Sequence, residues 1–139
     1  MTSTELFFRK ELAKEIRNVS RLMKDETNVE KKLYYFSAAY GVASRTYRYS
    51  FTKKVLLAEL VLQTSYSSIM DRIMRIKSGD VTVPLDEKVF VTIVDGLKKL
   101  ADAIETDAPI QEALEMILTA SFSTSGPGYY LMEKGMFEL

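Results

Sequence analysis

The chain has 139 residues and no net charge, and it contains neither histidine nor cysteine. The absence of imidazole excludes the usual general base near neutral pH and the Ser-His-Asp and Cys-His nucleophile systems. The absence of both residue types excludes ordinary zinc sites and disulfides. An active site in this chain would therefore consist of carboxylates, lysine or arginine, hydroxyl groups and backbone.

The composition, 47% hydrophobic and 27% charged residues, is typical of one soluble globular domain. No uninterrupted apolar run approaches the about 20 residues that a membrane-spanning helix needs. The first residues, Met1 to Glu5, continue into mixed charge and lack the apolar core of a signal peptide. We therefore expect a cytoplasmic protein with no membrane contact.

Apolar residues recur at spacings of three and four over residues 3–24, which predicts an amphipathic helix. A break follows at residues 25–28. Thr27 and Glu30 then predict a capping box for a second helix, which begins near residue 28 and reaches a turn or kink at residues 49–52. A glycine inside a helix costs about 1 kcal/mol relative to alanine. We therefore expect tight helix packing at Gly41 to compensate for it.

A third helix, capped by Ser50 or Thr52, runs to about residue 76 and is the most apolar element. Its apolar residues cover more than one face, so it is expected either to be central or to meet a second subunit. Gly79 predicts a left-handed cap at its end. A fourth helix begins near residues 85–86, and Asp107 is expected to cap a fifth that has Pro109 in its first turn.

These elements predict an all-α fold, namely a single-domain helical bundle with four long helices and a shorter C-terminal helix. The domain spans residues 1–139. Residues from about 121 to 139, which begin with a serine- and glycine-rich stretch, are expected to form a loosely packed C-terminal arm.

Charge is distributed unevenly along the chain. Residues 1–70 carry 12 lysines and arginines and 7 acids, whereas residues 71–139 carry 7 and 12. Residues 31–58 hold six basic residues and no acid. This asymmetry predicts that the two halves pack as complementary neighbours or pair head to tail in a dimer; the alternative is an anionic partner at the basic segment.

The basic and aromatic segment 45–54 is the candidate ligand site. Arginine and lysine pair with phosphate, tyrosines stack on bases, and a helix N-terminus adds backbone donors. The alternative is that the tyrosines belong to the core and the charges are solvated. The lack of net positive charge disfavours duplex nucleic acid, whereas a small phosphorylated molecule remains compatible. The candidate binding residues are Arg45, Tyr47, Arg48, Tyr49 and Lys53.

Carboxylates on apolar helices suggest a further hypothesis, because Glu59, Asp71 and Asp95 offer oxygen ligands for Mg²⁺ or Mn²⁺. However, the chain lacks the histidines of di-iron bundles, and structural ion pairs are commoner than metal sites. We assign no catalytic residue, no metal ligand and no cofactor.

Two segments are distinctive, residues 35–41 (YFSAAYG) and residues 55–60 (VLLAEL). In these segments, and over most of its length, the chain resembles a small family of uncharacterised archaeal all-helical proteins. The resemblance implies a helical bundle and brings no catalytic motif. Helical nucleotide-binding and ribonuclease domains of the HEPN type depend on an arginine–histidine motif, which a chain without histidine cannot supply.

The leading functional hypothesis is a non-enzymatic interaction or scaffold protein that acts through self-association, as a homodimer, or through a protein partner. An alternative is a binding module for a nucleotide or another phosphorylated small molecule, which uses segment 45–54. A carboxylate-metal enzyme with Mg²⁺ or Mn²⁺ is the third hypothesis.

Overall fold

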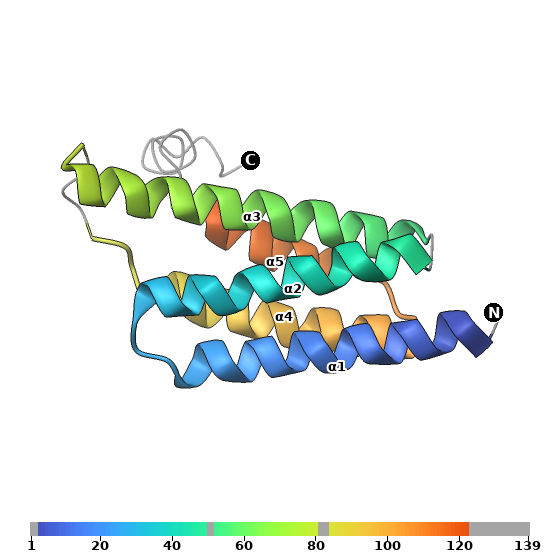
Figure 1. The fold of residues 1–139 in the computed structure, drawn as a ribbon. Coiled ribbons are helices and arrows are strands. Elements are labelled where there is room, and N and C mark those ends of the chain that lie inside the picture. The colour runs from blue at the N-terminus through green and yellow to red at the C-terminus, as the bar shows by residue number, and fades with distance from the viewer. Residues whose placement is uncertain (1–2, 50–51, 81–83, 123–139) are drawn as a thin grey trace.

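The computed structural model describes residues 3–49, 52–80 and 84–122, and it shows five helices and no strand within them (Figure 1). Four helices are long and the last is short, so the predicted all-α bundle is confirmed. Residues 81–83 and residues 123–139, which make up most of the predicted C-terminal arm, lie outside the described residues. The helices are α1 (Ser3–Asp25), α2 (Val29–Tyr49), α3 (Lys53–Ser78), α4 (Lys88–Thr106) and α5 (Gln111–Phe122).

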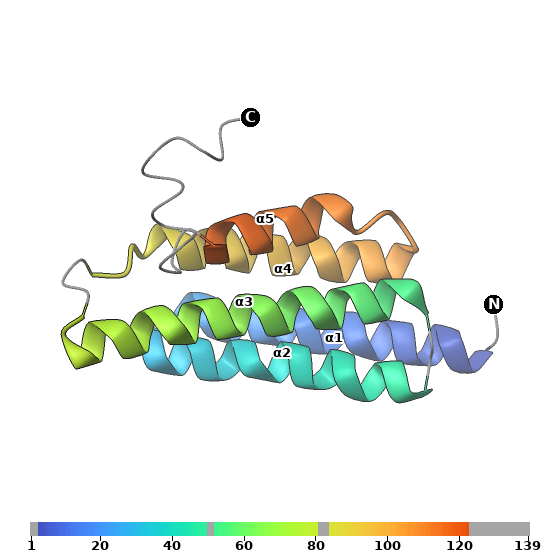
Figure 2. The same ribbon diagram turned by 90° about the horizontal axis from the view of Figure 1, so that it is seen from above.

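The five helices close into a ring around one core. Each helix packs mainly against two others: α1 against α2 and α4, α3 against α2 and α5, and α4 against α5. Successive helices run in opposite directions (Figures 1 and 2). A ring with an odd number of alternating helices requires one parallel pair, and that pair is α3 and α5.

The apolar stripes predicted from the periodicity line the centre of this ring. In α1 the side chains of Leu12, Ile16, Val19 and Met23 are buried. Phe36 of α2 is also buried, and α4 buries apolar side chains along most of its length. All of these residues belong to a single hydrophobic cluster. One continuous core therefore holds the described helices together, through burial worth about 25 cal/mol per Å² of apolar surface.

Both predicted caps of α3 that lie in the described residues are confirmed. The Thr52 hydroxyl oxygen accepts a hydrogen bond from the Val55 backbone N–H at 3.3 Å. Gly79 ends the helix with φ 85°, and its N–H donates to the Ile76 carbonyl. At the start of α2, however, Asn28 provides the cap in place of Thr27. The Asn28 side-chain oxygen accepts from the Lys31 N–H at 3.0 Å.

Asp107 ends α4, so the prediction that it caps the fifth helix is wrong. It adopts the left-handed conformation with φ 56°, and its backbone N–H donates to the Ala103 carbonyl. Aspartate tolerates this conformation better than most residues do, so it can occupy a position that usually selects glycine. Pro109 correspondingly lies before α5, which begins at Gln111.

The third helix lies in the ring and is not central. Its outward stripe includes Leu57, Leu60 and Met74, whose side chains are 49%, 48% and 56% exposed. The expectation of a central position is therefore wrong, and the expectation that this face meets a second subunit stays a prediction.

The close helix approach expected at Gly41 occurs at Gly96. A Cβ atom added to Gly41 would have no neighbour within 4 Å. A Cβ atom at Gly96 of α4 would lie 2.7 Å from Cγ1 of Ile117 in α5. Glycine at position 96 therefore permits the contact between α4 and α5, whereas Gly41 faces open space.

We predict opposite effects for two alanine substitutions. Gly41→Ala should raise the free energy of unfolding by up to about 1 kcal/mol, because alanine is the better helix former and meets no obstacle. Gly96→Ala should lower it by about 1–3 kcal/mol, because Ile117 must move. Urea unfolding followed by circular dichroism measures both variants. A shift of the two midpoints in the same direction would contradict this account of the α4–α5 contact.

Candidate functional site

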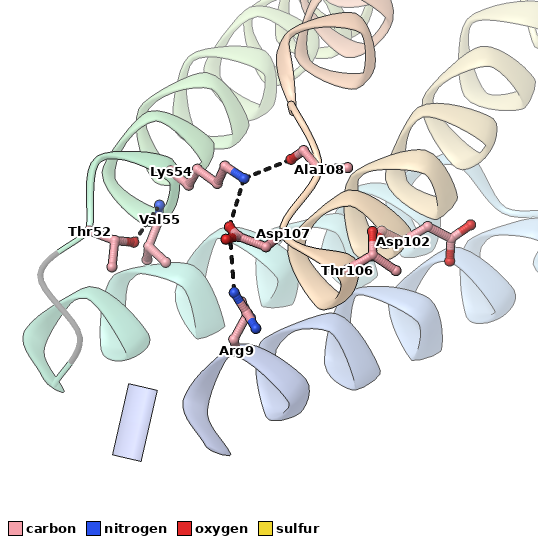
Figure 3. A network of polar contacts seen from close by, with 8 residues as sticks. All are labelled: Arg9, Thr52, Lys54, Val55, Asp102, Thr106, Asp107 and Ala108. Atoms are coloured by element: carbon pink, nitrogen blue, oxygen red, sulfur yellow. Dashed lines mark hydrogen bonds and ion pairs between the residues drawn. The ribbon is translucent and has the colours of Figure 1, made fainter. Parts of the chain in front are cut away.

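Polar side chains from three helices meet at the end of the bundle where α1 and α3 begin and α4 ends (Figure 3). Lys54 Nζ donates hydrogen bonds to Asp107 Oδ1 at 2.9 Å and to the Ala108 carbonyl at 2.8 Å. Arg9 Nη1 lies 3.4 Å from the same Asp107 oxygen. We call Arg9, Lys54 and Asp107 the Asp107 junction. It ties the end of α4 to the starts of two helices that are distant in sequence.

The charges of this junction perturb its carboxylate. The hydrogen bond from Lys54, the charge of Lys54 and then the charge of Arg9 hold the pKa of Asp107 below its ordinary value of 3.8. A carboxyl group whose pKa falls on folding stabilises the folded state above its ordinary pKa. That contribution disappears as the pH falls through the lowered value.

A cavity of about 220 Å³ lies beside the junction. Val55 and Ile104 supply apolar wall, while Thr52 stands at the start of α3. The other lining residues are charged and of both signs: Glu5, Arg9, Lys54 and Asp107. The cavity combines an apolar wall with a few convergent polar groups, which is the general make-up of small-molecule sites.

Arg9 and Arg17 lie on the same helix and face the same end of α4. Their guanidinium groups differ in how many of their N–H donors have an acceptor. Arg17 donates to Glu105 and to Asp102, in both cases at 2.7 Å. Arg9 has one longer contact, and its Nε is buried without an acceptor among the described residues. A buried donor without a partner costs about 1–3 kcal/mol. Arg17 thus connects α1 to α4 through two short ion pairs, whereas Arg9 keeps N–H donors that have no acceptor among the described residues.

Ion pairs explain part of the charge asymmetry along the sequence. Arg9, Arg17 and Lys54 come from the basic half of the chain, and their partners Asp102, Glu105 and Asp107 come from the acidic half. The interpretation that the two halves pack as complementary neighbours is confirmed for these residues.

The predicted ligand-binding residues belong to the end of α2 and the start of α3, at the same end of the bundle as this junction, and none of them lines its cavity. Arg45 and Arg48 are exposed on the last turns of α2, where positive charge complements the helix C-terminus, and Lys53 is exposed at the first position of α3. None of the three has an ion pair in the described part of the chain. Tyr47 packs partly against the core. The Tyr49 side chain lies outside what the structure describes.

Two immediate sequence neighbours of the predicted residues, Thr52 and Lys54, do line the cavity. Segment 45–54 therefore contributes to the cavity lining only through Thr52 and Lys54 at the beginning of α3. The sequence prediction missed Arg9, because nothing local in the sequence shows that the start of α1 lies beside the start of α3.

The proposed metal ligands are not brought together. Asp71 pairs with Arg75 at 2.9 Å within α3, Glu59 is partly buried, and Asp95 is exposed on α4. Across residues 3–49, 52–80 and 84–122, no group of three or more acids could hold a metal ion. The structure therefore adds no support to the carboxylate-metal hypothesis.

An apolar groove follows the parallel pair α3 and α5. We call it the α3–α5 groove; its volume is about 380 Å³. Leu57 forms the α3 side, and Gln111 and Glu115 add polar groups on the α5 side. Leu60 lies one helical turn after Leu57 on the same face of α3 and is equally exposed. The remaining lining residues are Pro109, Ile110, Leu114 and Leu118.

Comparison with known proteins identified no matching family model, no similar curated protein and no similar solved structure. The resemblance to archaeal helical proteins gains no support from these comparisons. Among the described helices, none has both the length and the apolar character needed to cross a membrane.

We predict that Asp107→Asn lowers stability at neutral pH and that this effect vanishes in acid. Asparagine tolerates the left-handed conformation, so the substitution removes the charge and leaves the backbone in place. As the pH falls below the ordinary carboxyl pKa of 3.8 and through the lowered pKa of folded Asp107, the wild-type side chain becomes neutral as well, and the two proteins should converge in unfolding free energy.

Urea titrations at several pH values test this prediction. Asp95→Asn is the matched control, since Asp95 is exposed on α4 and makes no ion pair with any described residue; it should show no such pH-dependent difference. A stability difference between Asp107→Asn and wild type that stays constant from neutral pH into acid would contradict the role given to the junction.

Proposed function

We propose that this protein acts by association and that its basic unit is a homodimer formed through the α3–α5 groove and the adjacent outer face of α3. The observation that carries the proposal is the half-exposure of Leu57 and Leu60 beside this groove. Burying such surface against a second copy removes apolar area from water, which is the main favourable term in most protein association.

Charge supports a second copy of this chain as the occupant. Lys53, Leu57 and Leu60 follow one another at helical spacing on the outer face of α3, so the face carries a cation next to two leucines. Glu112 and Glu115 are exposed on α5, and Glu115 lines the groove. In a two-fold symmetric dimer each face meets its own copy. Lys53 of one protomer would then approach Glu115 of the partner subunit, and the reverse.

The size of a stable interface adds a further requirement. Specific interfaces bury about 800 Å² on each partner, which is more than two leucines provide. We therefore expect the dimer to include neighbouring exposed positions on α3, such as Gln63 and Thr64, as its polar rim. Such a rim around an apolar centre is the usual composition of an interface.

The cellular location and the relatives of the protein are proposed from the sequence alone. We propose that the protein is cytoplasmic and that it is related to the archaeal helical family. A protein partner in place of a second copy would use the same groove, and the isolated chain would then be a monomer.

We predict that Leu57→Lys converts the dimer into a monomer, because it buries a charge in the centre of the interface. Leu22→Lys is the matched control: Leu22 is 45% exposed, close to the 49% of Leu57, but lies on α1. Sedimentation equilibrium gives the masses. The control should remain dimeric, and both variants should fold as judged by circular dichroism. A monomeric wild-type protein, or equal loss of dimer in both variants, would refute the proposal.

A charge reversal tests the orientation of the two copies. Lys53→Glu and Glu115→Lys should each weaken the dimer by a few fold, since exposed pairs contribute up to about 1 kcal/mol. The double variant should recover the wild-type dissociation constant, because it restores the pair with the charges exchanged. Additive weakening in the double variant would show that these two residues do not face each other.

A further inference from the structure

We infer that the cavity beside the Asp107 junction is a binding site for a phosphate group, held by Lys54, Arg9 and the first turn of α3. The site is distinct from the groove proposed for association, and it rests on three independent features of the described residues. These are the hydrogen-bond donors of Lys54 and of the start of α3 beside the cavity, the unsatisfied donors of Arg9, and the size of the cavity.

The donors come from side chains and backbone. Lys54 carries three N–H groups, of which two donate to Asp107 and Ala108. At the N-terminus of α3 the hydroxyl of the capping residue Thr52 accepts from the Val55 N–H. The N–H groups of Lys53 and Lys54, the first two residues of the helix, have no acceptor within that helix. These donors lie at the positive end of the helix dipole, which favours an anion.

Arg9 adds a guanidinium that the fold itself does not saturate. Its contact with Asp107 is 3.4 Å long, compared with 2.7 Å for both contacts of Arg17. Charge-assisted bonds of this type are normally about 2.7–2.9 Å long. The Arg9 side chain is 18% exposed, so it lies mostly inside the protein. An anion in the cavity would give this guanidinium the acceptor that Asp107 offers only at long range.

The carboxylates define which anion fits. Asp107 Oδ1 is already shared by both cations, and Glu5 places a second carboxylate in the lining. A phosphate group brings several acceptor oxygens for donors from two helices, whereas one carboxylate offers two. A water molecule, with one heavy atom, occupies about 30 Å³, and a phosphate group has five heavy atoms. A cavity of about 220 Å³ is therefore larger than a bare phosphate. It has room for a small phosphate monoester whose hydroxyl or amino groups face Glu5.

Titration with inorganic phosphate, followed by ¹H–¹⁵N nuclear magnetic resonance at constant ionic strength, tests the inference. We expect saturable shifts of the backbone N–H signals of Lys53 and Lys54 and of the Arg9 side chain. Lys54→Gln and Arg9→Gln should each weaken binding about tenfold or more, as expected for loss of a hydrogen bond to a charged group.

The adjacent residues provide the matched controls. Lys53→Gln and Lys10→Gln remove the same charge one residue away, from exposed side chains that do not line the cavity, and should leave the dissociation constant within about twofold. The Leu57→Lys variant should also bind phosphate normally, which separates this site from the dimer.

Two results would overturn the inference. One is an absence of saturable shifts at the start of α3 in the wild-type protein, a result that needs no variant to fold. The other is an equal loss of affinity in Lys53→Gln and Lys54→Gln, which would show that phosphate responds to surface charge and not to the cavity.

Discussion

Closure of the ring is the constraint on which the rest of this structure depends. Five amphipathic helices bury their apolar stripes only by surrounding a common core, and each described helix does so with two neighbours. Because successive helices alternate in direction and their number is odd, one neighbouring pair must be parallel (Figures 1 and 2). That pair is α3 and α5, whereas α1 and α4, the other neighbours that are not consecutive in the chain, are antiparallel. The α3–α5 groove lies along this seam.

The same closure determines how the ends of the helices are used. It brings the starts of α1 and α3 to the end of α4, where Asp107 adopts the left-handed conformation and accepts from Lys54. One oxygen of Asp107 thereby connects three helices. Asp107 is strongly constrained, because its backbone ends α4 and its side chain pairs with both Arg9 and Lys54. The cavity beside it is formed by the same three helix ends, so the polar site is a consequence of the topology.

Local patterns in the sequence predicted the helices, because periodicity and caps such as Thr52 and Gly79 depend on neighbouring residues. Contacts between distant segments could not be derived in this way. Arg9 meets Asp107 only because of the ring, and Gly41 and Gly96 look equivalent until their neighbours are known. Aspartate can cap the start of a helix or occupy the left-handed position at its end, so the sequence alone does not show whether Asp107 begins α5 or ends α4. For the same reason the basic segment 45–54 includes Thr52 and Lys54, which line the cavity, but gives no sign of Arg9.

Dipolar electron paramagnetic resonance between single spin labels tests the dimer most directly, and the chain has no native cysteine to interfere. A label at Thr64→Cys lies on the outer face of α3, whereas one at Lys14→Cys lies on α1, across the ring from the groove. A dimer formed through the α3–α5 groove should give a single short distance between the two labels at position 64 and a longer one at position 14. A shorter distance at position 14, or no coupling at either position, would contradict it.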